Sequence, residues 1–454
     1  MTTIVAFVVV LGILILVHEF GHFIVARLAG VGVERFSIGF GPVLWRIRGK
    51  ETEYCLSAFP LGGYVKMMGD DENPLEGGKT GTVDPARAFN NKPLPIRFLI
   101  VFAGPAMNCV LAVVIFALVF MILGRPVAPA VVGRVAEGKP AAQAGVRTGE
   151  RIVAVDGRPV QYWDDVVKAV QDLRGETIQL SVRSSDGSER KVGVTPARIK
   201  TRDLFGDERD VWDIGAHPFM PPVIGEALAG FPAQKAGLKS GDRVVAIEGR
   251  PVSTWDDLAE GIRERAGQPT RLEVKREAAT LTVSVTPNST KEKGPGGKEI
   301  EVGRIGIGPA APTTFVRSNP VTALWEGAVR TAEVTELTAV GLYKIARGQL
   351  DRKNIGGPIQ IAVTAGEQAR QGLPSLAFFT AVISVNLFLL NLLPIPMLDG
   401  GHLLFFVCEG VLGRPLSVRK REVAQQVGFG LLMLLMVYAL YNDLDRIGLF
   451  NMFR

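Results

Sequence analysis

Two histidines and a glutamate in the first apolar stretch of the chain have the spacing of a metal-dependent hydrolase. His18, Glu19 and His22 form the pattern H-E-x-x-H. On a helix this spacing places both imidazoles on one face, where they can hold a zinc ion, and the glutamate can take a proton from a water molecule. The pattern follows Ile4–Val17, fourteen residues without a charge. Ionisable groups in a membrane segment are costly and usually functional, so we interpret the cluster as a catalytic metal site.

The composition indicates a membrane protein that also has sizeable soluble regions. The chain has 454 residues, 47% of them hydrophobic, and a formal charge of +6. Four stretches are long and apolar enough to span a membrane, at residues 4–25, 98–123, 373–393 and 427–441. The first lacks a basic start and an A-x-A cleavage site, so we expect it to remain as a helix. The three cysteines form no C-x-x-C pair, which argues against a disulfide framework or a thiolate zinc site.

Basic residues between the spans predict how the chain crosses the membrane. Ten Lys and Arg lie between Ala26 and Arg97, and four lie between Arg414 and Arg421. Loops rich in positive charge stay cytoplasmic, so both termini and the long middle region are expected outside, in the periplasm of a bacterium. The first and third spans then run in the same direction. Their polar ends would meet at a similar depth near the cytoplasmic face.

The middle region contains an internal duplication. Pro140–Asp165 and Pro232–Asp257 are identical at 15 of 26 positions. In each copy we expect a strand, Arg151–Val155 or Arg243–Ile247, followed by a helix and two β-rich runs. The pattern P-A-x-x-A-G-[VL]-x-x-G-[DE]-x-[IV] resembles bacterial PDZ domains, which bind extended peptides by strand addition. Whether these units bind peptides or act as steric spacers is left open by the sequence.

Several motifs together resemble the site-2 protease family of intramembrane zinc metalloproteases. Besides H-E-F-G-H they are F-S-I-G-F-G-P at 36–42, P-L-G-G-Y-V-K-M at 60–67, F-N-N-K at 89–92, A-G-P-x-x-N at 103–108 and N-L-L-P-I-P-x-L-D-G-G at 391–401. The resemblance covers essentially the whole chain. It implies that His18, His22 and Asp399 bind zinc and that Glu19 is the catalytic base.

The residues around the third span agree with this implication. Asp399 is the only acid in that segment and its flank, and a catalytic zinc takes three protein ligands and keeps one position open. A plain Asp-Gly turn is the alternative. His402 is expected to pack beside the site, and nothing is expected of His217. The resemblance implies that Asn386 and Asn391 contact an unwound substrate, although such amides also commonly bond neighbouring helices.

A membrane-spanning substrate must unwind before it is cut, and its backbone then needs new partners. The segment Thr52–Met67 contains Gly62 and Gly63 and could fold as a hairpin beside the zinc, where its edge could bind substrate as an added strand. The resemblance implies a membrane-reentrant β element here. The segment Pro320–Leu350 is predicted to be helical and could lie along the outer membrane boundary.

The predicted fold is therefore a multi-domain membrane protein. It has a four-helix transmembrane metalloprotease core with a membrane-associated β hairpin, plus two tandem α+β PDZ domains. We expect the core at residues 1–126 and 373–454, the PDZ domains at 127–221 and 222–312, and an amphipathic linker at 313–372.

The resemblance implies cleavage of single-span membrane proteins at the bacterial inner membrane. Expected substrates are anti-sigma factors already shortened outside by another protease, and remnant signal peptides, in an envelope stress response. Expected partners are these substrates, the lipid bilayer and peptides at the PDZ domains, with no nucleic acid. The alternatives are a PDZ scaffold or chaperone with an inactive metal site, against which Glu19 argues, and a metal transporter, which leaves the duplication unexplained. Zinc is inferred from the ligand types, which other divalent ions would also fit.

Overall fold

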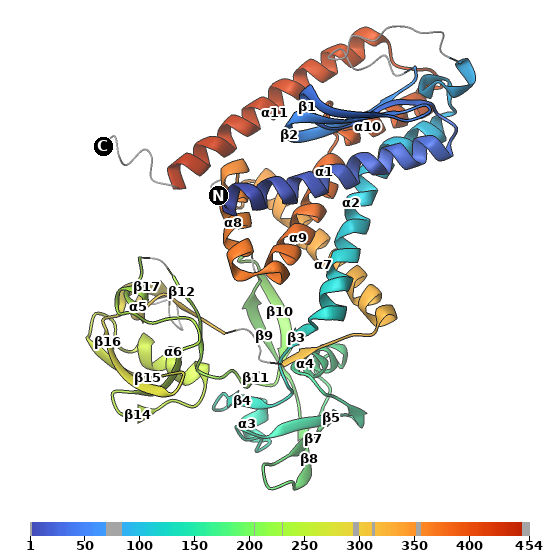
Figure 1. Ribbon diagram of the computed structural model, residues 1–454. Coiled ribbons are helices and arrows are strands. Elements are labelled where there is room, and N and C mark those ends of the chain that lie inside the picture. Colours follow the sequence, from blue (N-terminus) through green and yellow to red (C-terminus); the bar gives the residue numbers. More distant parts are fainter. Residues whose placement is uncertain are drawn as a thin grey trace. The chain divides into compact units, whose positions relative to one another are not determined.

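The chain divides into two compact units in the computed structural model (Figure 1). The first unit combines both ends of the chain, Met1–Gly124 and Arg317–Arg454, and the second is Arg125–Val316. The structure describes residues 2–69, 84–203, 205–228, 230–293, 299–310, 314–350 and 356–446. The predicted domain boundary between 312 and 313 lies outside these residues.

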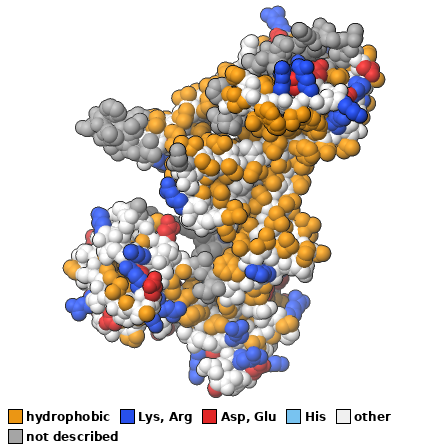
Figure 2. Space-filling model, viewed as in Figure 1, with side chains coloured by type: hydrophobic (Ala, Val, Ile, Leu, Met, Phe, Trp, Pro, Cys, Tyr) orange, Lys and Arg blue, Asp and Glu red, His pale blue; other side chains and the backbone are white. Residues whose placement is uncertain are grey.

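Four helices of the first unit are long and apolar enough to cross a membrane. They overlap the four predicted spans, and the last helix extends beyond the predicted 427–441 at both ends. A helix satisfies its own backbone hydrogen bonds, which an apolar run in lipid requires. Hydrophobic side chains cover most of the face of this unit seen in Figure 2. The four helices are α1 (Thr2–Leu28), α2 (Leu94–Ile122), α9 (Leu373–Asn391) and α11 (Val418–Arg446).

Helix α7 (Pro320–Ala346) packs against α2 and α9. It begins at Asn319, whose side chain accepts a hydrogen bond from the backbone N–H of Thr322 at 2.9 Å. Gly327 allows a close approach to α2, because a Cβ atom there would lie 2.7 Å from the carbonyl oxygen of Val113. The helix predicted in this segment is confirmed, and its position at the membrane boundary stays a prediction.

Two shorter helices complete the unit, α8 (Pro358–Gln371) and α10 (Asp399–Leu412). The buried carboxylate of Asp443 on α11 accepts hydrogen bonds from the first backbone amides of α8. The donors are the N–H groups of Gly357 at 2.9 Å, Ile359 at 3.0 Å and Gln360 at 3.1 Å. An acid at a helix N-terminus satisfies amides that have no partner within the helix, so Asp443 ties α11 to α8.

Strands β1 (Val33–Arg48) and β2 (Glu53–Met67) form an antiparallel sheet with a strong curl. Ile38 in the first half of β1 lies opposite both Leu56 and Gly63 of β2, whereas the second half of β1 pairs with the beginning of β2. The last part of β2, residues 63–67, pairs only with β1 among the described residues, so its other side is an edge. The expected hairpin within Thr52–Met67 is therefore one strand, whose partner precedes it in the chain.

The second unit contains two four-stranded sheets with the same order of elements. The predicted strands are confirmed as β5 (Arg151–Val155) and β13 (Arg243–Ile247), and the helices α4 (Trp163–Asp172) and α6 (Trp255–Arg263) begin at the predicted tryptophans. The first sheet has the order β6 (Arg158–Pro159), β5, β7 (Ile178–Arg183), β8 (Glu189–Val194), and the second has the order β14 (Arg250–Pro251), β13, β15 (Thr270–Arg276), β16 (Ala279–Val285). Each sheet and its helix enclose a separate apolar core, with Ile152 and Leu180 in the first and Val244 and Leu272 in the second.

The remaining bounds follow the chain order. The first half of this unit contains β3 (Arg125–Val127), β4 (Val132–Val135), α3 (Pro140–Gln143), β5 (Arg151–Val155), β6 (Arg158–Pro159), α4 (Trp163–Asp172), β7 (Ile178–Arg183), β8 (Glu189–Val194), β9 (Ala197–Arg202), β10 (Glu208–Asp213) and β11 (Ala216–Pro218). The second half contains β12 (Ile224–Ala227), α5 (Pro232–Lys235), β13 (Arg243–Ile247), β14 (Arg250–Pro251), α6 (Trp255–Arg263), β15 (Thr270–Arg276), β16 (Ala279–Val285), β17 (Asn288–Lys293), β18 (Glu299–Arg304), β19 (Ile307–Pro309) and β20 (Thr314–Val316).

The chain leaves and re-enters the first unit at neighbouring points. The backbone N–H of Ser318, just before α7, donates to the carbonyl oxygen of Phe120, near the end of α2, at 3.3 Å. The first and last strands of the second unit, β3 and β20, pair with each other. The second unit is therefore an insertion whose two ends lie side by side.

Candidate metal centre

The H-E-x-x-H motif lies in the second half of α1, where two imidazoles share one helix face as the spacing predicts. His22 is buried, and its Nδ1 lies 2.9 Å from the carbonyl oxygen of Ile100 on α2. Two glycines allow α1 and α2 to pack this closely. A Cβ atom at Gly21 would collide with the backbone of Ala103, and one at Gly104 would collide with the ring of His22.

Asp399 is the first residue of α10, and the chain before it is folded sharply. Helix α9 ends at Asn391, and the prolines at 394 and 396 prevent it from continuing. Gly400 and Gly401 are needed for this fold, because a Cβ at Gly401 would lie 2.5 Å from the carbonyl oxygen of Ile395 and one at Gly400 would overlap backbone before the prolines. The L-D-G-G sequence thus lets the chain turn back and direct the Asp399 carboxylate at α1.

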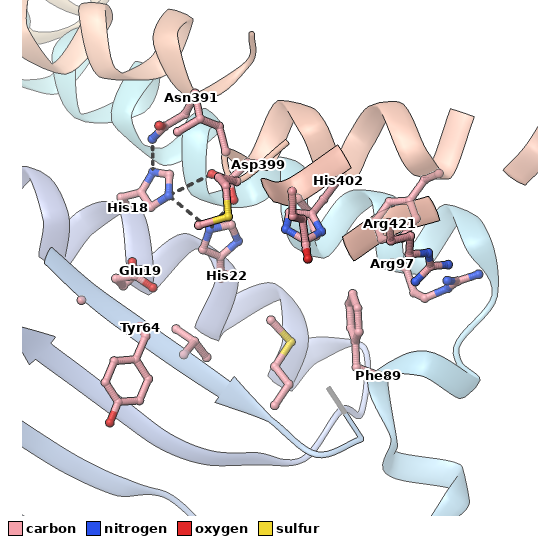
Figure 3. Close-up of a pocket in the computed structure, with 18 of the residues that line it drawn as sticks. His18, Glu19, His22, Tyr64, Phe89, Arg97, Asn391, Asp399, His402 and Arg421 are labelled. Carbon is pink, nitrogen blue, oxygen red and sulfur yellow. Dashed lines mark hydrogen bonds and ion pairs between the residues drawn. The ribbon is translucent and has the colours of Figure 1, made fainter. Parts of the chain in front are cut away.

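The three predicted ligands meet in the structure (Figure 3). The Nε2 atom of His18 lies 3.0 Å from Oδ2 of Asp399, and Nε2 of His22 lies 3.6 Å from Oδ1 of the same carboxylate. The two Nε2 atoms are 3.2 Å apart. One ligand atom from each residue can be chosen so that all lie within 4.8 Å of one another.

This donor set fits a tetrahedral zinc site. Zinc bonds of about 2.0–2.2 Å would separate tetrahedral ligand atoms by roughly 3.3–3.6 Å, close to the separations observed here. Two imidazoles and one carboxylate leave the fourth position open. Burial alone would raise the pKa of the Asp399 carboxyl, but the neighbouring rings of His22 and His18 hold this pKa below its ordinary value. A carboxylate binds a metal in its ionised form, and the imidazoles bind it in their neutral form.

A cavity of 720 Å³ opens beside the three ligands. It is lined by α1, the end of β2, α2, the turn before α10, α10 itself and the first half of α11. Glu19 lies on its wall, next to His18 and opposite Tyr64 of β2 (Figure 3). A ligand can therefore reach the three clustered residues from the side of Glu19.

Glycines bring β2 against the motif helix. A Cβ atom at Gly63 would lie 2.9 Å from Cγ of Glu19 and 2.8 Å from the carbonyl oxygen of Ser37. Gly62 has a φ of +149° and would meet the ring of Phe40. Gly63 lines the cavity together with Tyr64 and other residues of the β2 edge. The predicted role of both glycines in substrate binding stays a prediction, and the structure supplies the reason for their small size.

The other candidate residues lie in different surroundings. Asn391 lines the cavity, with its Nδ2 3.5 Å from Nδ1 of His18, whereas Asn386 accepts a hydrogen bond from Thr338 of α7 at 2.9 Å and is not in the cavity wall. His402 lines the cavity with its ring against Phe405 and is not one of the three clustered ligands. His217 is exposed and lies on β11 of the second unit, outside the unit that contains the three clustered residues.

Sequence reasoning missed the contribution of α2. Asn108 is completely buried, and its Nδ2 lies 3.4 Å from Nδ1 of His18. Gly104, one turn earlier, makes room for His22. Both belong to the A-G-P-x-x-N motif, which was noted without a role. The missing information was how α2 packs on α1, which is not encoded in the spacing of either motif alone.

Comparison with known proteins identifies the family. The sequence profile of peptidase family M50 matches residues 6–435. This chain belongs to peptidase family M50. It is 38% identical to the regulator of sigma-E protease RseP of Salmonella typhimurium, over 97% of this chain and 98% of that protein. It is 39% identical to the protein of the same name in Escherichia coli, with the same coverage.

A further M50 relative, from Ralstonia nicotianae, is 37% identical over 99% of both chains, and its name gives it as an inferred zinc metalloprotease. The resemblance found in the motifs is thus confirmed at the level of the family. The chain is an M50 metallopeptidase, and its four apolar helices make it a membrane protein.

Proposed function

We propose that this M50 peptidase is an intramembrane zinc endopeptidase that cuts the transmembrane segments of single-span proteins. The observation that carries the proposal is the convergence of His18, His22 and Asp399 within a unit of membrane-length helices, beside an open cavity. The cavity has a strand edge on its wall. A water-soluble peptidase has no reason to place two histidines and a glutamate in a helix of this kind.

In this proposal His18, His22 and Asp399 hold the metal and Glu19 is the general base. A zinc ion bound there supplies a Lewis acid for peptide hydrolysis. Glu19 takes a proton from the attacking water and later passes it to the leaving amine. Its place on the cavity wall, within the same helix turn as both histidines, supports this role.

The edge of β2 provides backbone partners for an unwound substrate. A peptide bond is cut only after its helix opens, and lipid offers nothing to the freed amides and carbonyls. The segment 63–67 faces the cavity and has one unpaired side among the described residues, so a substrate can add to it as a further strand. Asn391 at the cavity wall can bond the same extended backbone. Asn386 already accepts a hydrogen bond from Thr338, so it would have to exchange this bond to contact a substrate through its amide oxygen.

The proposed orientation places the metal centre near the cytoplasmic face of a bacterial inner membrane. The basic loops between the spans support it. The second unit is then periplasmic, and its two halves are PDZ domains. Each half contains a four-stranded sheet, and the two sheets have the same order of elements, which supports the assignment.

The proposed substrates are anti-sigma factors already shortened outside the membrane, and remnant signal peptides, in an envelope stress response. Relatives are named as regulators of sigma-E, and this supports the class of substrate. The periplasmic unit would exclude proteins that still carry bulky outer domains, or bind their new ends as peptides.

Metal analysis paired with a cleavage assay tests the proposal. We expect purified wild type to hold one zinc and to cut a single-span model substrate, and Asp399→Ala to lose both properties, because two imidazoles alone bind zinc weakly. Retained metal and activity in Asp399→Ala would eliminate the third ligand. Zinc flux into vesicles without any cleavage would favour a transporter instead.

A further inference from the structure

Helix α2 touches both histidines of the metal centre, and it does so with one short motif. Within A-G-P-x-x-N, Gly104 lies against the ring of His22, and Asn108, one turn later, lies against the ring of His18. The carbonyl of Asn108 accepts a hydrogen bond from Ser384 of α9 at 2.7 Å. This buried bond fixes the backbone of Asn108 between α1 and α9.

The two rings differ in what faces their second nitrogen. Both direct Nε2 at Asp399, so Nδ1 points away from the carboxylate in each case. Nδ1 of His22 lies 2.9 Å from a backbone carbonyl, that of Ile100. Nδ1 of His18 has two side-chain amides near it, Asn108 at 3.4 Å and Asn391 at 3.5 Å. His18 is therefore oriented by side chains, whereas His22 is oriented by the main chain.

A histidine that binds a metal through Nε2 carries its hydrogen on Nδ1 and must donate it. Metal-bound histidines almost always donate this hydrogen to a carbonyl or carboxylate oxygen. The amide nitrogen of Asn108 now faces Nδ1, and its Oδ1 is buried without a hydrogen-bond partner. A half-turn about the last side-chain bond exchanges the two amide atoms, which places Oδ1 in front of Nδ1.

We propose that Asn108 is a positioning residue of the metal centre, which accepts the Nδ1 hydrogen of His18 and so holds its ring with Nε2 toward the metal. The inference rests on the proposed zinc site. Asn108 is preferred over Asn391 because its side chain is fully buried and its Oδ1 has no hydrogen-bond partner. Asn391 lines the cavity and stays free to turn toward a substrate.

Measurements of zinc affinity distinguish the positioning role of Asn108 from the substrate-binding role of Asn391, and they need no measurement of activity. The full-length protein in detergent is titrated against a chromophoric zinc chelator, and Asn108→Leu, Asn108→Asp and Asn391→Leu are compared. We expect Asn108→Leu to weaken zinc binding about 10- to 100-fold, the usual effect of losing such a partner. Asn108→Asp keeps an acceptor oxygen and should restore affinity to within a few-fold of wild type. Asn391→Leu should weaken zinc binding less than Asn108→Leu does.

Two controls make every outcome decisive. The unfolding midpoint of the zinc-free proteins shows whether a variant is merely misfolded, and Asn108→Ala replaces Asn108→Leu if the larger side chain does not fit. Wild-type affinity in Asn108→Leu or Asn108→Ala would overturn the proposal. Equal losses in the Leu and Asp variants would reduce Asn108 to a packing residue and also overturn it. Wild-type zinc binding in Asp399→Ala would instead refute the site itself.

Discussion

Glu19 is the side chain on which the proposed chemistry depends, and it can be changed without removing a ligand. We expect Glu19→Gln to lower the cleavage rate by about 10²- to 10⁴-fold, the usual contribution of a general base, while zinc binding persists. Rates on a model single-span substrate and zinc content by atomic absorption check this. Glu422→Gln, on α11 in the same cavity wall, is the matched control and should cost little. Full activity in Glu19→Gln would favour a different base.

A buried ion pair holds the far wall of the cavity together. Nη2 of Arg97 lies 2.6 Å from Oε1 of Glu409, with 11% and 14% of the two side chains exposed. Arg97 also lies over the ring of Phe406, and Arg421 of α11 approaches the same carboxylate at 3.9 Å. This cluster joins α2, α10 and α11.

Removing the shared carboxylate should therefore destabilise the protein. We expect Glu409→Gln to cost on the order of 3 kcal/mol, because it leaves a buried arginine without its counter-charge. Glu333→Gln breaks an exposed pair with Arg330 on α7 and should cost less than about 1 kcal/mol. Thermal unfolding midpoints in detergent compare the two variants. A smaller loss in Glu409→Gln than in Glu333→Gln would contradict the argument.

At the residue level the meeting of His18, His22 and Asp399 could be predicted, whereas the residues that pack against this cluster could not. The H-E-x-x-H spacing of His18 and His22 is typical of a metal site, and the family resemblance added Asp399. Asn108 ends a motif to which no role could be assigned from the sequence, and Arg97 lies in none of the motifs. Their roles depend on which helix faces meet, and this follows from tertiary packing rather than from the local sequence.

At the scale of elements, the close packing of α1 and α2 depends on glycines. We expect Gly104→Ala to push the His22 ring away from Asp399 and to weaken zinc binding by at least about tenfold, since its Cβ has no room beside that ring. Chelator competition measures the affinity. Gly12→Ala, in the same α1 helix but with no atom near its added Cβ, is the control and should bind zinc as wild type does.

Each half of the second unit contains one buried carboxylate at an equivalent position. Glu150 accepts a hydrogen bond from Arg190 of β8 at 2.8 Å, and Asp242 accepts one from Arg276 of β15 at 2.7 Å. Each arginine also bonds the carbonyl of the glycine that precedes the turn, Gly145 or Gly237. The acids are equivalent in the duplication but the arginines come from different strands, so the pairing could not be predicted from the alignment of the two copies.

These pairs make the second unit sensitive to acid. Burial by itself raises the pKa of Glu150, but Arg190 and the backbone amide of Arg147 lower it below the ordinary value overall. A depressed pKa means that the stabilisation is present above about pH 4.5 and is lost as the pH falls through the folded-state value. We expect Glu150→Gln to cost on the order of 1–3 kcal/mol at pH 7 and less near pH 3. Hydrogen exchange of β5 and β8 measures it, and an equal loss at both pH values would argue against the charge.

Strand positions in the second unit were predictable because each copy alternates apolar and polar residues between glycine turns. The β1–β2 sheet was not, because its two strands curl and one half of β1 pairs with two parts of β2. Such a register depends on long-range contacts with α1, and a local reading of Thr52–Met67 finds only β propensity and two glycines.

At the scale of the whole molecule, the metal centre is assembled from the two ends of the chain, and the second unit is inserted between them. We expect replacement of residues 125–316 by a short Gly-Ser linker to leave zinc affinity unchanged, because the flanking residues Phe120 and Ser318 are already hydrogen-bonded. If the second unit excludes bulky substrates, the shortened protein should also cut single-span proteins that keep a folded outer domain. Zinc titration and a cleavage assay on paired substrates check both parts.

The hydrogen bond between Phe120 and Ser318 has a consequence for how the peptidase can be taken apart. The coding sequence can be divided inside the insertion to give two fragments. The first fragment carries both imidazoles of the metal site, and the second carries the carboxylate. Co-expression of the two fragments should reconstitute a working enzyme, whereas either fragment alone should be inert. Such a pair would report, through recovered hydrolysis, whether any two membrane proteins fused to the fragments meet in the bilayer.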